Sequence, residues 1–261
     1  MFGACVHPEA ARGRHALDER AYGVASTALT AATRARPNEL SYWVDLGRAH
    51  VGQGDAPRAQ AAFARAIALS PDEARLHVYL GHAFELARGY DQAEIEYRRA
   101  VALEPARAWP LRVLGARLLK WGRFSDAVPV LEQALTRDPD HAETHNALAI
   151  ALVKAGDRDA AESRFRAAIA RFPEQRTLAL GLGALLIDAG RTRDALAVYT
   201  TTAQRWPQYA PLHVARAVLL EQLGDLQGAQ AALAEALRLS PNNHDYQGRM
   251  AALRRTASTA E

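Results

Sequence analysis

Cysteine and long apolar runs are nearly absent from this sequence. Cys5 is the only cysteine, so no disulfide can form within the chain. No run of about 18 apolar residues occurs, so no membrane-spanning helix is expected. These two absences exclude a disulfide-stapled domain and an integral membrane bundle. The N-terminus also has no apolar signal region, so we expect a cytoplasmic protein.

A strong excess of one charge is missing too. The chain has 32 basic and 29 acidic residues, and its formal net charge of +3 is too balanced to indicate nucleic-acid binding. Only Lys120 and Lys154 are lysines, which leaves 30 arginines among the 32 basic residues. Because alanine is also abundant, we interpret this bias as that of a GC-rich bacterial genome. Hydrophobic residues make up 49% of the sequence, which indicates a packed core.

What the sequence does contain is a pattern that returns at a constant interval, and it is clearest over residues 40–73. Trp43, Leu46 and Gly47 have the i, i+3, i+4 spacing of one face of an amphipathic helix. Gly54-Asp55 then supplies a turn signal. The first half of the pattern therefore predicts a helix followed by a tight turn.

The second half of the pattern predicts another helix, which packs against the first. Ala59, Phe63, Ala66 and Ile67 mark its inner face, where small residues allow close approach and Phe63 fills the space. Pro71 ends the unit, because the residue before a proline is steered away from helical dihedral angles. A helix pair of this size cannot bury its apolar face alone, whereas stacked copies can.

The pattern W-x2-L-G … G … A-x3-F-x2-A … P over residues 40–73, together with the interval at which it returns, resembles the tetratricopeptide repeat. The resemblance implies an all-α fold, namely a right-handed α-solenoid of about seven helix pairs plus a C-terminal capping helix. It also implies that the first helix of each pair lines an inner groove that binds other proteins.

The period predicts a single superhelical domain over residues 6–243. Its repeats are 6–39, which is degenerate, 40–73, 74–107, 108–141, 142–175, 176–209 and 210–243. A capping helix is expected over 244–256, and residues 1–5 and 257–261 are expected to be tails. No insertion breaks the period and no segment is left for a catalytic domain, so we do not expect an enzyme.

Two local departures from the pattern carry expectations of their own. The turn glycine of repeat 74–107 stands one place later than in the other repeats, at Gly89. Pro129 falls inside the second helix of its repeat, where a proline is expected to cost stability or to bend the helix.

The resemblance also implies which side chains line the groove, because the exposed positions of each first helix are the second, fifth, ninth, twelfth and thirteenth. The residues expected to bind a partner there are Val44, Arg48, Val51, Arg75, Val78, His82, Trp109, Arg112, Leu119, Lys120, Asn146, Ile150, Val153, Lys154, Leu180, Ile187, Val214 and Val218. Glu85 is expected to be an exposed acidic member of the same set.

Two features of this set suggest the kind of ligand. Basic groups are confined to the first five repeats, and apolar groups run continuously from Leu119 to Val218. An exposed apolar row usually marks an interaction surface, although self-association or neighbouring helices can also cover it. We therefore expect an extended or helical peptide, with any acidic end toward Arg48, Arg75 and Arg112.

Two groove codes known from the family are absent. The positions that would form a carboxylate clamp for chaperone tails hold Val44, Arg48, Tyr79, Trp109 and Val113 in place of the lysines and asparagines that it requires. The positions of the asparagine ladder found beside a sugar transferase hold no asparagine. The resemblance therefore does not identify the partner.

Three candidate chemical sites are weak. His141 and His145 stand one helical turn apart, as zinc ligands can, but His145 takes the packing position of Trp43 and no third ligand is evident. The run from Gly181 to Gly183 follows no strand and is not a phosphate loop. Cys5 has no placed histidine partner for a catalytic thiol. We expect no metal and no cofactor.

The leading hypothesis is a non-catalytic scaffold that binds a protein or peptide partner to assemble a bacterial complex. The alternative is a periplasmic lipoprotein that assists pilus or envelope secretion assembly, because Phe2-Gly3-Ala4-Cys5 is similar to a lipoprotein cleavage box. It would require a true N-terminus upstream. RNA binding is a third hypothesis, but Trp109 is the only groove aromatic that could stack on a base, so no nucleic acid is expected.

Overall fold

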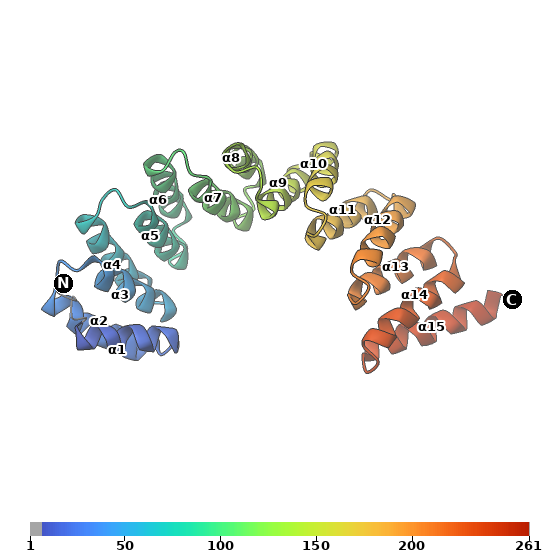
Figure 1. Ribbon diagram of the computed structural model, residues 1–261, viewed down its shortest axis with the longest axis horizontal. Coiled ribbons are helices and arrows are strands. Elements are labelled where there is room, and N and C mark those ends of the chain that lie inside the picture. The colour runs from blue at the N-terminus through green and yellow to red at the C-terminus, as the bar shows by residue number, and fades with distance from the viewer. Residues whose placement is uncertain (1–6, 261) are drawn as a thin grey trace. The chain divides into compact units, whose positions relative to one another are not determined.

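The computed structural model of the protein describes residues 7–260, and the side chains of residues 7–256. Within this range every regular element is a helix (Figure 1). The fifteen helices of these residues are α1 (Pro8–Asp18), α2 (Tyr22–Ala35), α3 (Leu40–Gly52), α4 (Ala56–Leu69), α5 (Ala74–Leu86), α6 (Tyr90–Leu103), α7 (Ala108–Lys120), α8 (Phe124–Arg137), α9 (Ala142–Ala155), α10 (Arg158–Arg171), α11 (Arg176–Asp188), α12 (Thr192–Arg205), α13 (Ala210–Gln222), α14 (Leu226–Leu239) and α15 (His244–Ala260).

The helices pack in consecutive pairs, so the predicted all-α fold of about seven pairs and one further helix is confirmed. Each predicted repeat contains two helices. The chain divides into two compact units, residues 1–139 and 140–261. In each unit, neighbouring pairs stack side by side in chain order (Figure 1). The single domain over 6–243 stays a prediction.

Small residues bring the two helices of a pair together, as predicted. A Cβ atom added at Gly81 would lie 2.6 Å from Cε1 of Tyr97, and one added at Gly115 would lie 2.5 Å from Cδ2 of Leu131. Both ring and leucine are buried on the partner helix, sixteen residues after the glycine. The first helix thus has a notch that the large side chain of the second helix fills, which gives close packing without a void.

The turn inside each pair uses a left-handed residue at a fixed place. Glycines with positive φ occupy it in five pairs, namely Gly54, Gly122, Gly156, Gly190 and Gly224. In the other two pairs the same place holds Arg20 (φ 58°) and Arg88 (φ 61°). Gly89, with φ of −82°, is the N-cap of α6. The glycine is displaced in the sequence, but the backbone of that turn keeps its register.

Aspartate begins three of the second helices. The side chain of Asp55 accepts a hydrogen bond from the backbone N–H of Arg58 at 3.1 Å, and Asp157 and Asp225 make the same bond to the third residue after them. Such caps satisfy one of the unpaired N–H groups at a helix start. They fix where α4, α10 and α14 begin.

A side-chain donor recurs at the fourth residue of several first helices. The indole of Trp43 donates to the carbonyl of Pro37 at 2.7 Å, and Nε2 of His213 lies 2.8 Å from the carbonyl of Pro207. The amide of Gln247 in α15 repeats the contact with Pro241, also at 2.8 Å. Because a proline turn has a carbonyl that no helix uses, these donors tie each pair to the turn before it.

Two further expectations, one for Pro129 and one for the C-terminal helix, can be compared with the structure. Helix α8 continues through Pro129, whose side chain is exposed, so the proline does not break the helix and its cost in stability stays a prediction. Helix α15 extends beyond the expected end at residue 256, as far as Ala260. The added residues are mostly alanine and threonine, with no proline or glycine to stop the helix.

Candidate functional site

The predicted groove positions differ in how far they reach solvent. Arg48, Arg75, Lys120, Ile150, Lys154 and Ile187 are exposed, and Val44, Val51, His82, Trp109, Arg112, Leu119, Asn146, Val153, Leu180, Val214 and Val218 are half-buried. Val78 is a correction, because only 7% of its surface is exposed and it belongs to the core. Its place on α5, between the neighbouring helix pairs, explains the burial.

In the first unit, a cavity of about 300 Å³ brings three of the predicted residues together, Arg48, Val51 and His82. Its other walls are Leu17, Tyr22, Gly52, Phe63 and Tyr79. The rings of Phe63 and Tyr79 stack with their centroids 5.5 Å apart. The cavity therefore has an aromatic and aliphatic interior with a guanidinium and an imidazole among its walls.

The charge beside this cavity is set by one carboxylate and two guanidiniums. Asp45, which is 8% exposed, accepts from Nε of Arg14 at 2.7 Å and lies 3.3 Å from Nη1 of Arg48. Arg14 also donates to Ser41 at 2.8 Å. Because one negative charge faces two positive ones, and the Arg48 side chain is 54% exposed, a net positive charge stays at the cavity.

His82 contributes a neutral ring to the same wall. Burial lowers the pKa of His82 from its usual value, and the positive charge of Arg117 lowers it further. The lowered pKa keeps the imidazole uncharged at neutral pH. His82 therefore offers this cavity a polar edge without adding charge.

Glu85 is a second correction to the predicted groove, because its side chain is only 8% exposed. It accepts hydrogen bonds from the hydroxyl of Tyr97 at 2.9 Å and the indole N–H of Trp121 at 2.8 Å. Nη1 of Arg117 lies 3.5 Å and Nζ of Lys120 3.9 Å from its oxygens. Glu85 is thus a buried polar junction of α5, α6 and α7, and Lys120 has an acidic neighbour.

The three arginines expected to receive an acidic ligand are not equivalent. Arg112 is paired with Asp138 at 2.7 Å. Arg48 shares Asp45 with another arginine. Arg75 is exposed and has no ion-pair partner among the residues that the structure describes. The positive charge available to a ligand of this unit is therefore at Arg48 and Arg75.

The groove positions of the second unit are more apolar. Ile150 on α9 and Ile187 on α11 are 39% and 38% exposed. Glu221, near the end of α13, pairs with Arg249 of α15 at 3.2 Å. The unit thus presents aliphatic side chains on its first helices.

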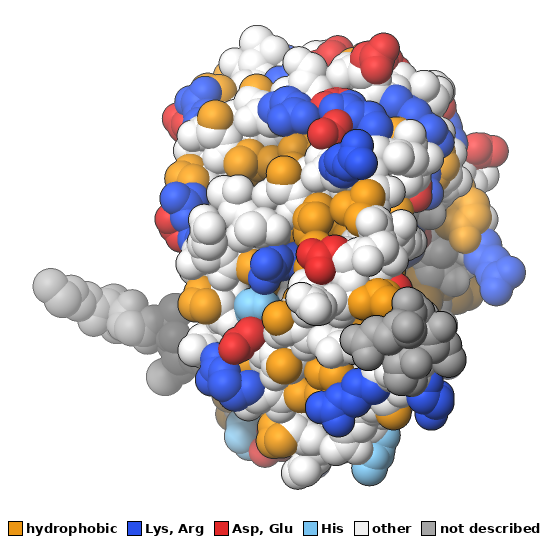
Figure 2. Space-filling view, turned by 90° about the vertical axis from the view of Figure 1, so that its right-hand side faces the viewer, with side chains coloured by type: hydrophobic (Ala, Val, Ile, Leu, Met, Phe, Trp, Pro, Cys, Tyr) orange, Lys and Arg blue, Asp and Glu red, His pale blue; other side chains and the backbone are white. Residues whose placement is uncertain are grey.

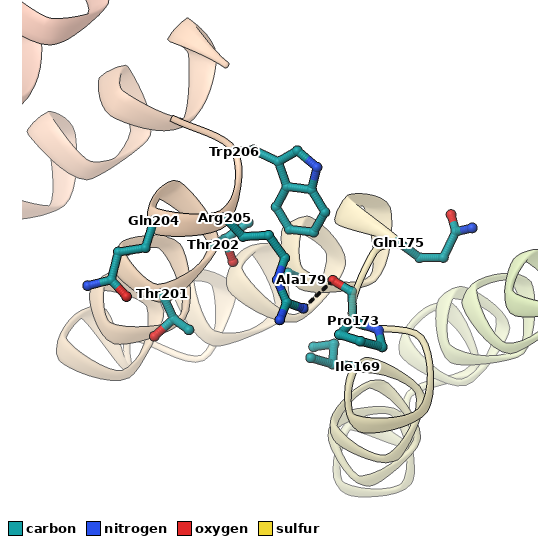
Figure 3. Close-up of a pocket in the computed structure, with 9 residues that line it drawn as sticks. All are labelled: Ile169, Pro173, Gln175, Ala179, Thr201, Thr202, Gln204, Arg205 and Trp206. Carbon is teal, nitrogen blue, oxygen red and sulfur yellow. Dashed lines mark hydrogen bonds between the residues drawn. The ribbon is translucent and has the colours of Figure 1, made fainter. Parts of the chain in front are cut away.

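A cavity that the groove pattern does not predict lies in the second unit, between the end of α10, helix α11 and the end of α12 (Figure 3). Its volume is about 350 Å³, and it is lined by Ile169, Pro173, Gln175, Ala179, Thr201, Thr202, Gln204, Arg205 and Trp206. One signal in the sequence could have found it. At the place of Trp206, four other repeats have a small or acidic residue, namely Ser70, Glu104, Asp138 and Ser240.

The histidines and the glycine weighed as parts of chemical sites have structural roles. His141 caps α9 by accepting from the backbone N–H of Thr144 at 3.3 Å, and His145 is buried against Phe172 with ring centroids 5.4 Å apart. A Cβ at Gly183 would overlap the ring of Tyr199, so this glycine serves packing. Within the described part of the chain, no three residues of the metal-binding types gather at one point.

Two further observations concern the compartment. Cys5, on which the lipoprotein alternative depends, lies outside the described residues. Among residues 7–260, no helix combines the length and apolar character that a membrane crossing requires.

The face of the molecule shown in Figure 2 carries basic, acidic and apolar side chains intermingled.

Solved structures with the same arrangement of helices are numerous. The C-terminal part of a tetratricopeptide repeat protein from Cytophaga hutchinsonii superposes with a TM-score of 0.72 at 15% identity, over 90% of this chain and 97% of that one. PilF of Pseudomonas aeruginosa gives 0.57 at 23%, over 84% and 99%. YrrB, described as a tetratricopeptide repeat protein with an unusual peptide-binding site, gives 0.53 at 18%, over 73% and 98%. Likenesses at these identities show the fold alone.

Family models match the sequence of this chain in addition to its fold. No curated protein sequence matches the chain. Models of the tetratricopeptide repeat match residues 44–110 and, in two consecutive copies, residues 118–186 and 186–253. The matched copies cover more than half of the chain and lie within the region of paired helices. The protein is therefore a member of the tetratricopeptide repeat family, whose repeats mediate protein–protein interactions.

Proposed function

We propose that this protein is a non-catalytic scaffold that holds a peptide segment of a partner protein against the first helices of its repeats. The observation that carries the proposal is the cavity of about 300 Å³ formed by Leu17, Tyr22, Arg48, Val51, Gly52, Phe63, Tyr79 and His82. It has the size of a small ligand site, and an apolar interior with few polar groups is typical of ligand-binding sites. Its walls come from three successive repeats, as expected for a groove.

The charges favour a ligand with an acidic residue close to an apolar one. Arg48 and Arg75 supply the positive charge left after internal pairing, and the nearest apolar surface is Val51 with Tyr79. In the second unit, Ile150 and Ile187 offer aliphatic contacts to a partner. The peptide-binding site described for YrrB agrees with this use of the fold, without indicating the ligand.

The test compares partners captured from a native lysate by the wild type and by two single variants, Val51→Glu and Ile187→Glu. A buried or contacted carboxylate would oppose binding of an apolar side chain, so we expect about a tenfold loss of the captured partner, which corresponds to about 1.4 kcal/mol. Ile95→Glu is the matched control, because Ile95 is 64% exposed on a second helix, α6, away from the groove positions.

Circular dichroism must show the same helicity for all four proteins. Retention of the partner by both groove variants would contradict the proposal, as would its loss in the Ile95→Glu control alone. Loss in only one groove variant would assign the contact to that unit.

A further inference from the structure

The second unit has an additional recess that the repeat does not need. The cavity of about 350 Å³ described above adjoins another of about 300 Å³, and the two share Arg205 and Trp206 as walls. In Figure 3, Arg205 extends from the end of α12 toward Pro173, and the indole of Trp206 lies beside it. None of the groove residues proposed above lines either cavity, so this edge site, defined by the two cavities, is distinct from the groove.

Its interior is apolar and aromatic. Ile169, Pro173 and Ala179 form one side of the first cavity, and Trp206 forms another. A tryptophan ring gives a large contact area to a second aromatic ring, with about 0.5–1.5 kcal/mol beyond area burial for a well-placed pair. The first cavity therefore suits an aromatic side chain.

The charged groups of the edge site are both guanidiniums. Nη1 of Arg205 donates to the carbonyl of Pro173 at 2.8 Å, and its Nε lies 3.8 Å from Glu174, so this arginine is already engaged. The guanidinium of Arg176 instead lies over the ring of Tyr209, 3.8 Å from the centroid. No aspartate or glutamate lines either cavity.

Arg176 is the group that lacks a counterion. Within the described residues it has no carboxylate at ion-pair distance, and its buried Nε has no hydrogen-bond partner. A guanidinium held flat by a ring is oriented for a planar carboxylate, and a poorly solvated cation gains most from an opposite charge. The recess is therefore built to receive an anionic group beside Tyr209.

Uncharged amides surround the two cavities. Gln175, Gln204 and Gln208 line them, and their side-chain amides make no hydrogen bond to other described residues. A primary amide both donates and accepts, so it can pair with the N–H and C=O groups of an extended backbone. These amides favour a peptide over a small inorganic anion.

We propose that the edge site binds a segment of a partner protein in which a carboxylate side chain stands next to an aromatic one. The aromatic ring enters the cavity against Trp206 and Ile169, and the carboxylate pairs with Arg176. The glutamine amides hold the backbone of the segment. The protein then has a second contact with a partner, separate from the groove and independent of it.

The experiment uses the full chain and a synthetic probe, acetyl-Gly-Gly-Glu-Phe-Gly-Gly-amide. Trp206 is the only tryptophan after residue 139, and its indole N–H resonance can be followed by NMR while that of Trp109 serves as an internal reference. We expect a saturable shift at Trp206 with a Kd of about 1 mM, as for a weak contact of about −4 kcal/mol. Replacing the peptide's Glu by Gln should weaken binding about tenfold.

The matched protein variants are Arg176→Gln and Arg193→Gln. Arg193 is exposed on α12 and lines neither cavity of the edge site. Arg176→Gln should weaken the glutamate probe about tenfold and leave the glutamine probe unchanged, whereas Arg193→Gln should change neither. The comparison of the two probes on the wild type does not depend on the folding of any variant.

The proposal would be overturned by the absence of a saturable shift at Trp206, by equal binding of the two probes by the wild type, or by full binding by the Arg176→Gln variant. A shift at the Trp109 resonance in place of Trp206 would assign the probe to the groove, and it would therefore also refute an edge site.

Discussion

Tyr97 both fills space in the core and donates a hydrogen bond to a buried carboxylate. Its ring fills the space left by Gly81, and its hydroxyl donates to Glu85 at 2.9 Å. The side chain is fully buried. Burial raises the pKa of Tyr97 well above its usual value, and the hydrogen bond to Glu85 raises it further. Burial raises the pKa of Tyr199 in the second unit in the same way.

These raised pKa values predict a loss of stability in alkali. Below about pH 10, the usual pKa of tyrosine, both hydroxyls are protonated in the folded and unfolded states, and their contribution is fully present. Above it, the unfolded chain releases protons that the folded chain retains, so the free energy of unfolding falls by up to about 1.4 kcal/mol per pH unit for each tyrosine. Urea unfolding between pH 8 and pH 11.5 measures this slope.

The tyrosine variants supply the control for the slope. Tyr97→Phe and Tyr199→Phe should each lower the slope of the free energy of unfolding against pH by up to the contribution of one proton. The double variant should have the smallest slope of the set. A slope that is the same in the wild type and the double variant would show that other groups cause the alkaline loss.

At the scale of the helix, α8 contains a proline that its packing does not use. Pro129 is the sixth residue of α8, so it withholds an N–H from the carbonyl of Ser125 four residues earlier. Its side chain is exposed. Pro57, by contrast, is the second residue of α4, where the N–H would have no helical partner.

Pro129→Ala should therefore stabilise the protein, by about 1–3 kcal/mol, because it restores a backbone hydrogen bond without removing a buried contact. Pro57→Ala is the control and should change the free energy of unfolding by less than about 0.5 kcal/mol. Urea titrations of both variants measure the difference. An equal effect of the two substitutions would mean that α8 has adapted to its proline at no cost.

The helices were predictable because their ends depend on local chemistry that repeats. The left-handed residue of each turn and the proline after each second helix define a pair within its own repeat. Even so, Gly89 suggested a shifted turn, whereas Arg88 takes the left-handed conformation at a cost of about 1–2 kcal/mol. The neighbouring pairs fix the backbone there more strongly than the residue type does.

The site was less predictable because its charges depend on partners in other helices. Glu85 occupies a groove position by spacing, yet Trp121 reaches it from 36 residues away and removes it from solvent. Arg112 loses its free charge to Asp138 in the same way, at a separation of 26 residues. The groove positions alone cannot show these pairings. The edge site escaped prediction because it belongs to the turns and not to the face that the pattern describes.

At the scale of the molecule, each of the two compact units is a row of neighbouring pairs. In such arrays, stability is close to a sum of terms for single repeats and for adjacent repeats. A local defect should therefore spread only to the nearest pairs. Gly183 of α11 allows a test, because a Cβ there would overlap the ring of Tyr199 on α12.

Gly183→Ala should destabilise the protein by about 1–3 kcal/mol, the usual cost of overpacking. Amide hydrogen exchange should accelerate most in α11 and α12, less in α10 and α13, and not measurably in α1–α6. Gly248→Ala is the control, since a Cβ at Gly248 meets nothing within 4 Å and should gain up to about 1 kcal/mol of helix propensity. Uniform acceleration along the whole chain would contradict the nearest-neighbour description.

The matching of small and large residues within a pair has a consequence for how such a gene can change. Gly47 accommodates Phe63 and Gly81 accommodates Tyr97, whereas Phe165 has Ala149 at the matching place of its own pair and takes the space beside Gly181 of the next. A crossover inside a pair would join halves of different shape. A crossover between pairs would keep Gly47 with Phe63 and Gly81 with Tyr97, so duplication or loss of whole repeats preserves such couples, except between α10 and α11, where Phe165 packs against Gly181 of the next pair.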